Sequence, residues 1–152
     1  LSLKIWTPYG MESKATWNIG RTSQEFAGCC LQMKLRDFGR FGQFILDGAR
    51  INDKSIVPDD WLQAATHTQI KLWPGWGYGY QWWTLSDGTF RALGIHGQMI
   101  HIDPVRHLVV VLNCAWPEAE SFKRQTAVDN FLRSVNSEID KESKDLKNGT
   151  DR

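Results

Sequence analysis

The stretch from residue 99 to residue 112 constrains the fold more than any other part of the chain. Residues 99–102 are typical of a β-strand, residues 103–106 (Asp-Pro-Val-Arg) of a turn, and residues 108–112 (Leu-Val-Val-Val-Leu) form an unbroken apolar strand. Such a run predicts a strand that is covered on both faces or lies centrally in its sheet. The turn between the two strands indicates that they belong to an antiparallel sheet.

A second hairpin is predicted directly upstream. Aromatic strand formers occupy residues 78–83, and Asp87-Gly88 is a hairpin turn signal. The chain is then expected to return as a strand over residues 90–93. The sheet is therefore predicted to be an antiparallel meander.

Helical patterns lie on both sides of this meander. Helices are expected over residues 34–47 and 58–65, and a long helix is expected to begin at Pro117. The predicted fold class is α+β, with a helical segment, then the meander, then the long C-terminal helix packed on the sheet. We expect one domain over residues 1–137 and a charged, fraying tail over residues 138–152.

Composition and charge argue against several classes of partner. The 152 residues carry 18 Lys and Arg against 17 Asp and Glu, which gives no electrostatic reason to expect nucleic acid or an anionic membrane as a partner. No apolar run reaches the ~20 residues that a membrane helix needs. No Cys-x-x-Cys or His-x-x-x-His spacing occurs, so we predict no metal site, and we expect no cofactor.

The cysteines bear on the cellular compartment. Neighbouring cysteines rarely form a strain-free bridge, so Cys29 and Cys30 are predicted to be free, buried thiols. Free thiols favour the cytoplasm as the localisation. The chain begins at Leu1, without methionine or a signal segment, and we expect the natural N-terminus to lie upstream.

Three long motifs occur in the order found in one family of hydrolases. They are EFAGCCLQMKLRDFGRFGQFILDGARINDKSIVPDDWL (25–62), GYGYQWW (77–83) and GIHGQMIHIDPVRHLVVVLNCAWP (94–117). Over residues 1–135 the chain resembles the serine β-lactamase-like hydrolases, in particular the esterases and 6-aminohexanoate-dimer hydrolases among them. The resemblance implies a partial β-lactamase/transpeptidase-like fold, with a sheet flanked by N- and C-terminal helices, and hydrolysis of amide or ester bonds.

The catalytic groups implied by this resemblance are missing from the sequence. The family uses the serine of a Ser-x-x-Lys motif, activated by that lysine and by the tyrosine of a Tyr-x-Asn motif. No serine here has lysine three residues later, and Tyr9, Tyr78 and Tyr80 are never followed two residues later by asparagine. In the family these groups precede the segment with which this chain begins. We therefore expect the chain to resemble the C-terminal half of such a hydrolase and to be inactive alone.

One catalytic donor is nevertheless implied by the resemblance. The segment Gly94-Ile95-His96-Gly97 matches the family's third motif, often Lys-Thr-Gly, at the edge of the active site, although Ala92 stands where the family has lysine. The backbone N–H of Ile95 matches a donor of the oxyanion hole. The glycines would permit close approach of substrate. His96 would either contact substrate or be a packed or solvated histidine.

The resemblance places GYGYQWW along the substrate cleft. Gln81, Trp82 and Trp83 are the candidate cleft residues, and core packing is the alternative for each tryptophan. Other polar residues have structural interpretations. His101 should face the side of its strand opposite Ile100 and Ile102, and Asp37 should favour the dipole of a first helical turn.

Three functions are consistent with this sequence. The first is a part of a serine hydrolase acting on a small-molecule amide or ester, to which it supplies the oxyanion-hole strand and a cleft wall. The others are a stand-alone, non-catalytic module that binds a ligand or partner, and a structural remnant that oligomerises. By resemblance, N-terminal strands pair beside the strand at residues 107–113, so the expected partners are the missing N-terminal half or a second copy in a homo-oligomer.

Overall fold

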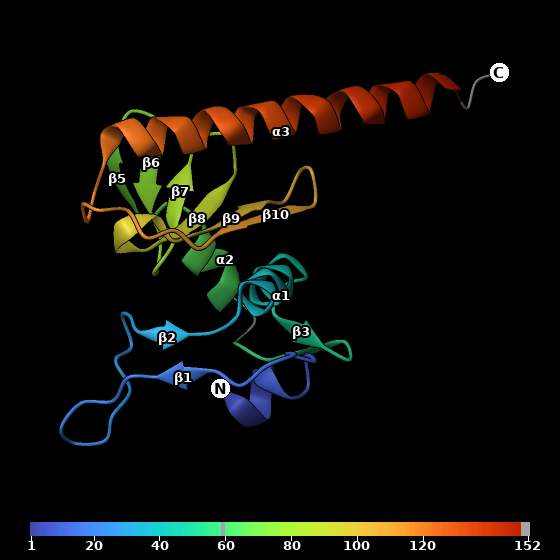
Figure 1. Cartoon of the computed structure of the whole chain (residues 1–152). Helices are drawn as coiled ribbons and strands as arrows, with labels where there is room; N and C mark the ends of the chain where they lie inside the picture. Colours follow the sequence, from blue (N-terminus) through green and yellow to red (C-terminus); the bar gives the residue numbers. More distant parts are fainter. Residues whose placement is uncertain (59, 150–152) are drawn as a thin grey trace. The chain divides into compact units, whose positions relative to one another are not determined.

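The computed structural model describes residues 1–58 and 60–149, which form two compact units (Figure 1). The larger unit comprises residues 1–94 and 98–113. The smaller unit comprises residues 95–97 and the chain from Cys114 onward. The larger unit carries a six-stranded sheet, and the smaller unit carries a long C-terminal helix. The predicted α+β class is confirmed.

The six-stranded sheet is an antiparallel meander, as the turn signals predict. Its strands lie in the order β10-β9-β8-β7-β6-β5, so each strand pairs with its neighbour in sequence. The strands are β5 (Ile70–Trp73), β6 (Trp76–Tyr78), β7 (Trp83–Leu85), β8 (Phe90–Leu93), β9 (Met99–Asp103) and β10 (Leu108–Leu112). In the β9–β10 turn, Asp103 accepts hydrogen bonds from the backbone N–H groups of Val105 and Arg106, each at 3.0 Å.

Two details of the sheet differ from the prediction. The aromatic run at residues 78–83 is not one strand, because the chain turns at Gly79–Trp82, where Gln81 has a φ of 67° and Gly79 N–H donates to Trp82 O. The apolar strand β10 lies at an edge of the sheet rather than at its centre, and all its residues are half-buried. This is the edge beside which the resemblance places N-terminal strands.

Helix α1 (Leu35–Leu46) forms where the apolar period predicts it. It contacts β9 and β10, as Figure 1 shows. Phe38, Phe41 and Ile45 pack against a buried cluster in which Ile100 and Ile102 come from β9. The apolar stripe of the helix thus covers one face of the hairpin.

Helix α2 (Trp61–Thr66) begins three residues later than the predicted start at Pro58. Its Ala65 is buried in the same core cluster as Trp82 and Phe90. The carbonyl of Ala65 also accepts a hydrogen bond of 3.0 Å from Tyr80 N–H. The helix therefore fixes the turn that interrupts the aromatic run.

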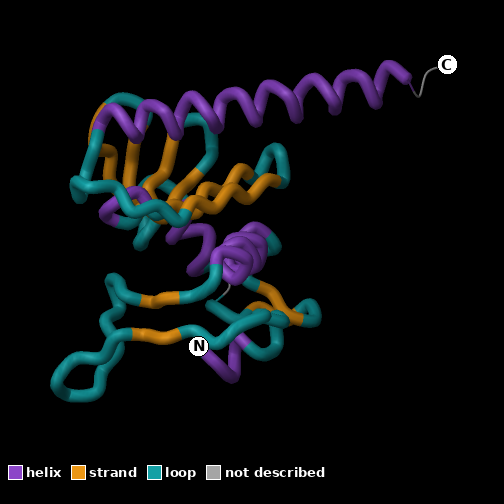
Figure 2. Tube along the Cα trace, viewed as in Figure 1, coloured by secondary structure: helices purple, strands orange, loops and turns teal. Residues whose placement is uncertain are grey.

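Short elements occupy the N-terminal part of the larger unit. They are a π-helical turn (Ser2–Trp6) and two strand pairs, β1 (Thr16–Trp17) with β2 (Leu31–Gln32) and β3 (Arg50–Ile51) with β4 (Lys54–Ser55) (Figure 2). Asp37 in the first turn of α1 ties this part to the helix. Its carboxylate accepts hydrogen bonds from the N–H groups of Glu12 and Ser13 and from Arg40.

The adjacent cysteines contradict the prediction of free, buried thiols. Cys29 and Cys30 are joined by a disulfide, with their Cα atoms 3.7 Å apart, and both residues are exposed. Cys30 adopts a left-handed φ of 74°, a backbone state that the prediction did not consider. Cys114 is half-buried and is not in a disulfide.

Helix α3 (Phe122–Gly149) begins later than the predicted start at Pro117. The backbone just before the helix forms hydrogen bonds to a distant residue instead of helical ones. Trp116 N–H donates to His96 O, and Ala119 O accepts from His96 N–H. The helix continues past residue 138, where the tail was expected to begin, and residues 150–152 of that tail lie outside the described part. Among the described residues, no helix has the length and apolar character to cross a membrane.

Candidate functional site

The segment predicted to carry the oxyanion donor is a short 3₁₀ turn, η2 (Ile95–Gly97). Its shape depends on left-handed backbone angles, a φ of 63° at His96 and of 89° at Gly97. A Cβ placed on Gly97 would lie 2.2 Å from the Trp116 indole. Both the backbone angle and the close indole therefore require glycine at this position.

The segment just before α3 holds this turn. His96 N–H donates to Ala119 O at 2.8 Å, and Trp116 N–H donates to His96 O at 2.9 Å. The imidazole makes a third bond, 2.8 Å between His96 Nδ1 and Trp116 O. A carbonyl can only accept, so this bond places a proton on Nδ1. His96 thus has the packed arrangement that was its alternative interpretation, and its contact with substrate stays a prediction.

The backbone amide of Ile95 is differently placed. As the first residue of the turn, it has no partner for its N–H inside the turn. Within the described part of the chain, no backbone or side-chain acceptor receives a hydrogen bond from this N–H. The Ile95 side chain is 65% exposed. Ile95 is therefore an exposed residue whose N–H has no acceptor within the described part of the chain.

Gly94 lies in the larger unit, at the end of β8. Its N–H donates to Gln98 O at 2.9 Å, which closes the chain across the turn. A Cβ on Gly94 would lie 2.7 Å from Gln98 Oε1, the far end of a flexible side chain. The absence of a side chain at Gly94 thus leaves room for Gln98, and contact of Gly94 with substrate stays a prediction.

The predicted cleft residues do not form one wall. Trp82 is only 7% exposed and packs edge to face with Phe90 at a centroid distance of 5.2 Å, inside the core. Trp83 on β7 packs instead edge to face with Tyr78 on β6, with a ring-centroid distance of 5.0 Å. The two indoles therefore have different neighbours, Trp82 in the core cluster and Trp83 among the aromatic rings of β5 and β6. Gln81 is exposed at the turn before them.

The sheet face that carries Trp83 has an aromatic cluster that extends beyond the predicted cleft residues. The ring of Trp73 lies 5.9 Å from that of Trp83 and 6.0 Å from that of Trp76. Trp73 is 53% exposed, and the Arg91 guanidinium lies 5.5 Å from the Trp76 ring centroid. We call Trp73, Trp76, Tyr78 and Trp83 the aromatic cluster. The alternation of Trp76 and Tyr78 around Gly77, after the Pro74-Gly75 turn, was the sequence signal for it.

The remaining polar candidates have structural partners. His101 is buried, and its Nδ1 accepts a hydrogen bond of 3.1 Å from Arg91 Nε. Arg106 forms a 2.8 Å ion pair with the buried Asp103. In the described part of the chain, no three His, Cys, Asp or Glu side chains gather into a group that would hold a metal ion.

Asp37 is the buried acid with the clearest electrostatic setting. Burial raises the pKa of its carboxyl, but hydrogen bonds from the N–H groups of Glu12 and Ser13, together with the Arg40 guanidinium, outweigh that effect and lower the pKa below its usual value. The Arg40 contact measures 3.0 Å. Asp37 lies in the first turn of α1 as predicted, and it also acts as an ionised anchor for the N-terminal segment.

Comparison with known proteins links this geometry to a group of hydrolases. No family model matches the chain. The chain is 24% identical to the 6-aminohexanoate-dimer hydrolase of Paenarthrobacter ureafaciens, a match that covers 92% of this chain and 39% of that protein. A solved structure from Bacillus anthracis, provisionally described as a 6-aminohexanoate-dimer hydrolase, superposes with a TM-score of 0.78 and 29% identity over 92% of this chain and 38% of that one.

The chain thus spans about two fifths of the length of both relatives. Sequence and fold agree on the same group of proteins, although only the structural match reaches more than a quarter identity. The motifs of residues 25–62, 77–83 and 94–117 predicted this relationship. Over 92% of its length, the chain is similar in sequence and fold to proteins described as 6-aminohexanoate-dimer hydrolases.

Proposed function

We propose that this chain is part of a serine hydrolase that acts on amide or ester bonds of small molecules. Its contribution is the N–H of Ile95, which donates to the substrate carbonyl oxygen as negative charge develops there. The proposal rests on a difference in hydrogen bonding between two backbone N–H groups of the same turn. The N–H of His96 is bonded to Ala119 O, whereas that of Ile95, an exposed residue, has no acceptor among the described residues.

The chemistry assigns this donor a supporting role. Attack of a serine hydroxyl on a carbonyl carbon moves an electron pair onto the carbonyl oxygen, and a fixed N–H stabilises that charge. One such donor is worth ~3 kcal/mol, less than the ~8 kcal/mol or more that enzymes remove from a barrier. No serine of this chain precedes a lysine by three residues. We therefore assign the nucleophile and its base to a segment other than these residues.

The edge of the sheet supports a partner for this chain. Strand β10 ends the sheet, so one row of its backbone N–H and C=O groups has no neighbouring strand within the larger unit. All five of its residues are apolar. We propose that β10 pairs with strands of an N-terminal half or of a second copy of the chain. If the partner is a second copy, sedimentation should show a dimer or larger species at tens of micromolar, and a monomer throughout would contradict pairing with a second copy.

Reconstitution tests the hydrolase proposal. The chain alone should not hydrolyse p-nitrophenyl acetate, nitrocefin or a linear aminohexanoate dimer above background. Co-expression with the N-terminal half of a related hydrolase, carrying Ser-x-x-Lys and Tyr-x-Asn, should produce esterase or amidase activity. A complex that assembles without turnover would contradict the proposal. Turnover by the isolated chain, with covalent labelling of one of its own serines, would show that the nucleophile lies within it.

A second candidate, a non-catalytic binding module, is favoured by the aromatic cluster. Trp73 is half-exposed beside Trp76 and Trp83, and such a surface can stack against an apolar or amide-bearing ligand. Titration of tryptophan fluorescence with short acyl amides and esters tests this function. A response that is lost in Trp73→Ala but kept in Trp61→Ala, whose indole is stacked on Tyr80 instead, would favour it. No response at millimolar ligand would remove it.

A further inference from the structure

The Cys29–Cys30 disulfide closes a small ring on the surface of the larger unit. The two residues are adjacent in sequence, so the ring contains the peptide bond between them. Both residues are exposed. Exposed disulfides are the ones that an external thiol can reach and exchange with. The bond is therefore accessible to reduction in the folded protein.

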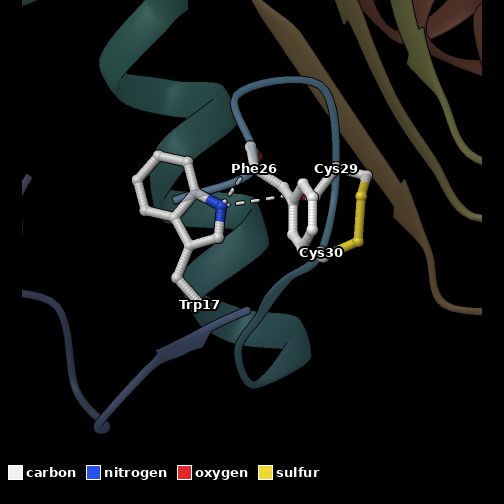
Figure 3. Close-up of a disulfide and its surroundings, with 4 residues drawn as sticks. All are labelled: Trp17, Phe26, Cys29 and Cys30. Atoms are coloured by element: carbon white, nitrogen blue, oxygen red, sulfur yellow. Dashed lines mark hydrogen bonds between the residues drawn. A yellow bond between two sulfur atoms is a disulfide. The ribbon is translucent and has the colours of Figure 1, made fainter. Parts of the chain in front are cut away.

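Hydrogen bonds join the backbone around the ring to β1 and to the residue that follows it. The Trp17 Nε1–H donates to Cys29 O at 3.0 Å and to Phe26 O at 3.0 Å, as Figure 3 shows. Asn18 N–H donates to Cys30 O at 3.2 Å. The Cys29 carbonyl belongs to the peptide bond inside the ring, so the ring fixes its direction. Opening the ring frees that carbonyl to rotate away from the indole.

The backbone angle at Cys30 gives a reason for the rotation. Its φ of 74° lies in the left-handed region, which residues with a side chain rarely adopt. Once the disulfide is cut, the ring no longer holds Cys30 there. Relaxation to a negative φ would turn the Cys29–Cys30 peptide and break the contacts to Trp17 and Asn18 together. A chemical change at two sulfur atoms would thus reach the β1–β2 pair.

This disulfide is expected to contribute little to the stability of the fold. A disulfide stabilises a fold mainly by shortening the loops of the unfolded chain, and the effect grows with loop length. A bridge between neighbouring residues closes the shortest loop possible. Its loss should leave the global stability almost unchanged and act on the local structure.

We propose that Cys29 and Cys30 form a reversible dithiol–disulfide modification site that controls the loop between β1 and β2. A thiolate of a dithiol reductant attacks one sulfur, the S–S bond breaks, and a mixed disulfide forms. The second thiol of the reductant then displaces that cysteine, so the reductant leaves as a cyclic disulfide and both cysteines become thiols after protonation. In the reduced form the loop is released from Trp17.

The test uses the whole chain in a Cys114→Ala background, so that only the adjacent pair can react. The folded protein is treated with dithiothreitol without denaturant, alkylated with iodoacetamide and mapped by mass spectrometry. Both Cys29 and Cys30 should be labelled, while the thermal midpoint changes little. Amide hydrogen exchange should become faster across residues 17–31 and stay unchanged in α1, and air or a disulfide oxidant should reverse both effects.

Trp17→Phe provides the coupling test. Losing the indole N–H should shift the equilibrium toward the dithiol by about two- to tenfold, the factor that one ordinary hydrogen bond supplies. Trp61→Phe is the matched control, because that indole stacks on Tyr80 and should leave the equilibrium unchanged. Three results would overturn the proposal: labelling only after unfolding, thiols that never reoxidise, or identical loop exchange in both states.

Discussion

Gly42 on α1 lies directly against Val109 on β10. A Cβ placed on Gly42 would be 2.5 Å from Val109 Cγ1 and 3.0 Å from Ile100 Cγ2. Glycine within a helix weakens that helix, so its position here reflects the close approach of helix and sheet. The contact sets how closely α1 covers the β9–β10 hairpin.

Alanine at Gly42 should therefore destabilise the fold. We expect Gly42→Ala to cost about 1–3 kcal/mol in the free energy of unfolding, as overpacking of a core does. Gly39 is the matched control, since a Cβ there meets nothing within 4 Å. Gly39→Ala should stabilise by about 0.5–1 kcal/mol through helix propensity. Urea unfolding of the two variants should give midpoints on opposite sides of the parent, and equal shifts would contradict the packing account.

Asp37→Asn should weaken the anchor of the N-terminal segment. At neutral pH the loss should be about 1–3 kcal/mol, since the N–H groups of Glu12 and Ser13 then face a poorer acceptor at a buried position. The lowered pKa of Asp37 means that its ionisation stabilises the fold above the unfolded pKa of about 4 and that this contribution is lost as the pH falls through the folded pKa. The difference in the free energy of unfolding between the parent and Asp37→Asn should therefore become smaller below pH ~4.

Urea midpoints measured between neutral and acid pH check this dependence. The exposed Asp53 serves as the control, because its side chain makes no ion pair among the contacts of the described chain. Asp53→Asn should follow the parent at every pH. A gap for Asp37→Asn that stays constant on acidification would show that the charge of Asp37 does not contribute.

Much of the fold was predictable because local signals agree with the final packing. The stripe of α1 and the turn chemistry at Asp87-Gly88 and Asp103-Pro104 specify elements without help from distant residues. The start of α3 was not predictable, since residues 116 and 119 bond to His96, far away in sequence. The Cys29–Cys30 bridge was missed for a different reason, because it depends on a left-handed φ that composition does not report.

The candidate site likewise has features that the sequence predicted and features that it did not. The position of Ile95 followed from motif order, and a backbone donor needs no particular side chain to be recognised. The sorting of Trp82 and Trp83 could not follow from a motif, because the turn at Gln81 decides which indole enters the core. Sequence proximity of two aromatic residues therefore did not imply a shared surface.

Gly97→Ala should disrupt the turn that presents Ile95. The cost has a backbone part of about 1–2 kcal/mol for a positive φ and a further part from the clash with Trp116. Gly88→Ala measures the backbone cost without the clash, because Gly88 has a φ of 86° and a Cβ there meets nothing within 4 Å. Thermal unfolding should show a larger loss for Gly97→Ala than for Gly88→Ala. Equal losses of thermal stability would mean that the Trp116 indole moves aside at no energetic cost.

The role of Ile95 as a donor is the central claim, and Ile95→Pro tests it most directly. Proline removes the N–H, and the backbone suits it, because Gly94 is extended (φ −101°, ψ 154°), as residues before proline prefer. In the enzyme reconstituted with an N-terminal half, kcat for p-nitrophenyl acetate should fall about 10²–10³-fold, while Ile95→Val, which keeps the N–H, should retain activity. If Ile95→Pro assembles normally and turns over as fast as Ile95→Val, the backbone amide is not the oxyanion donor.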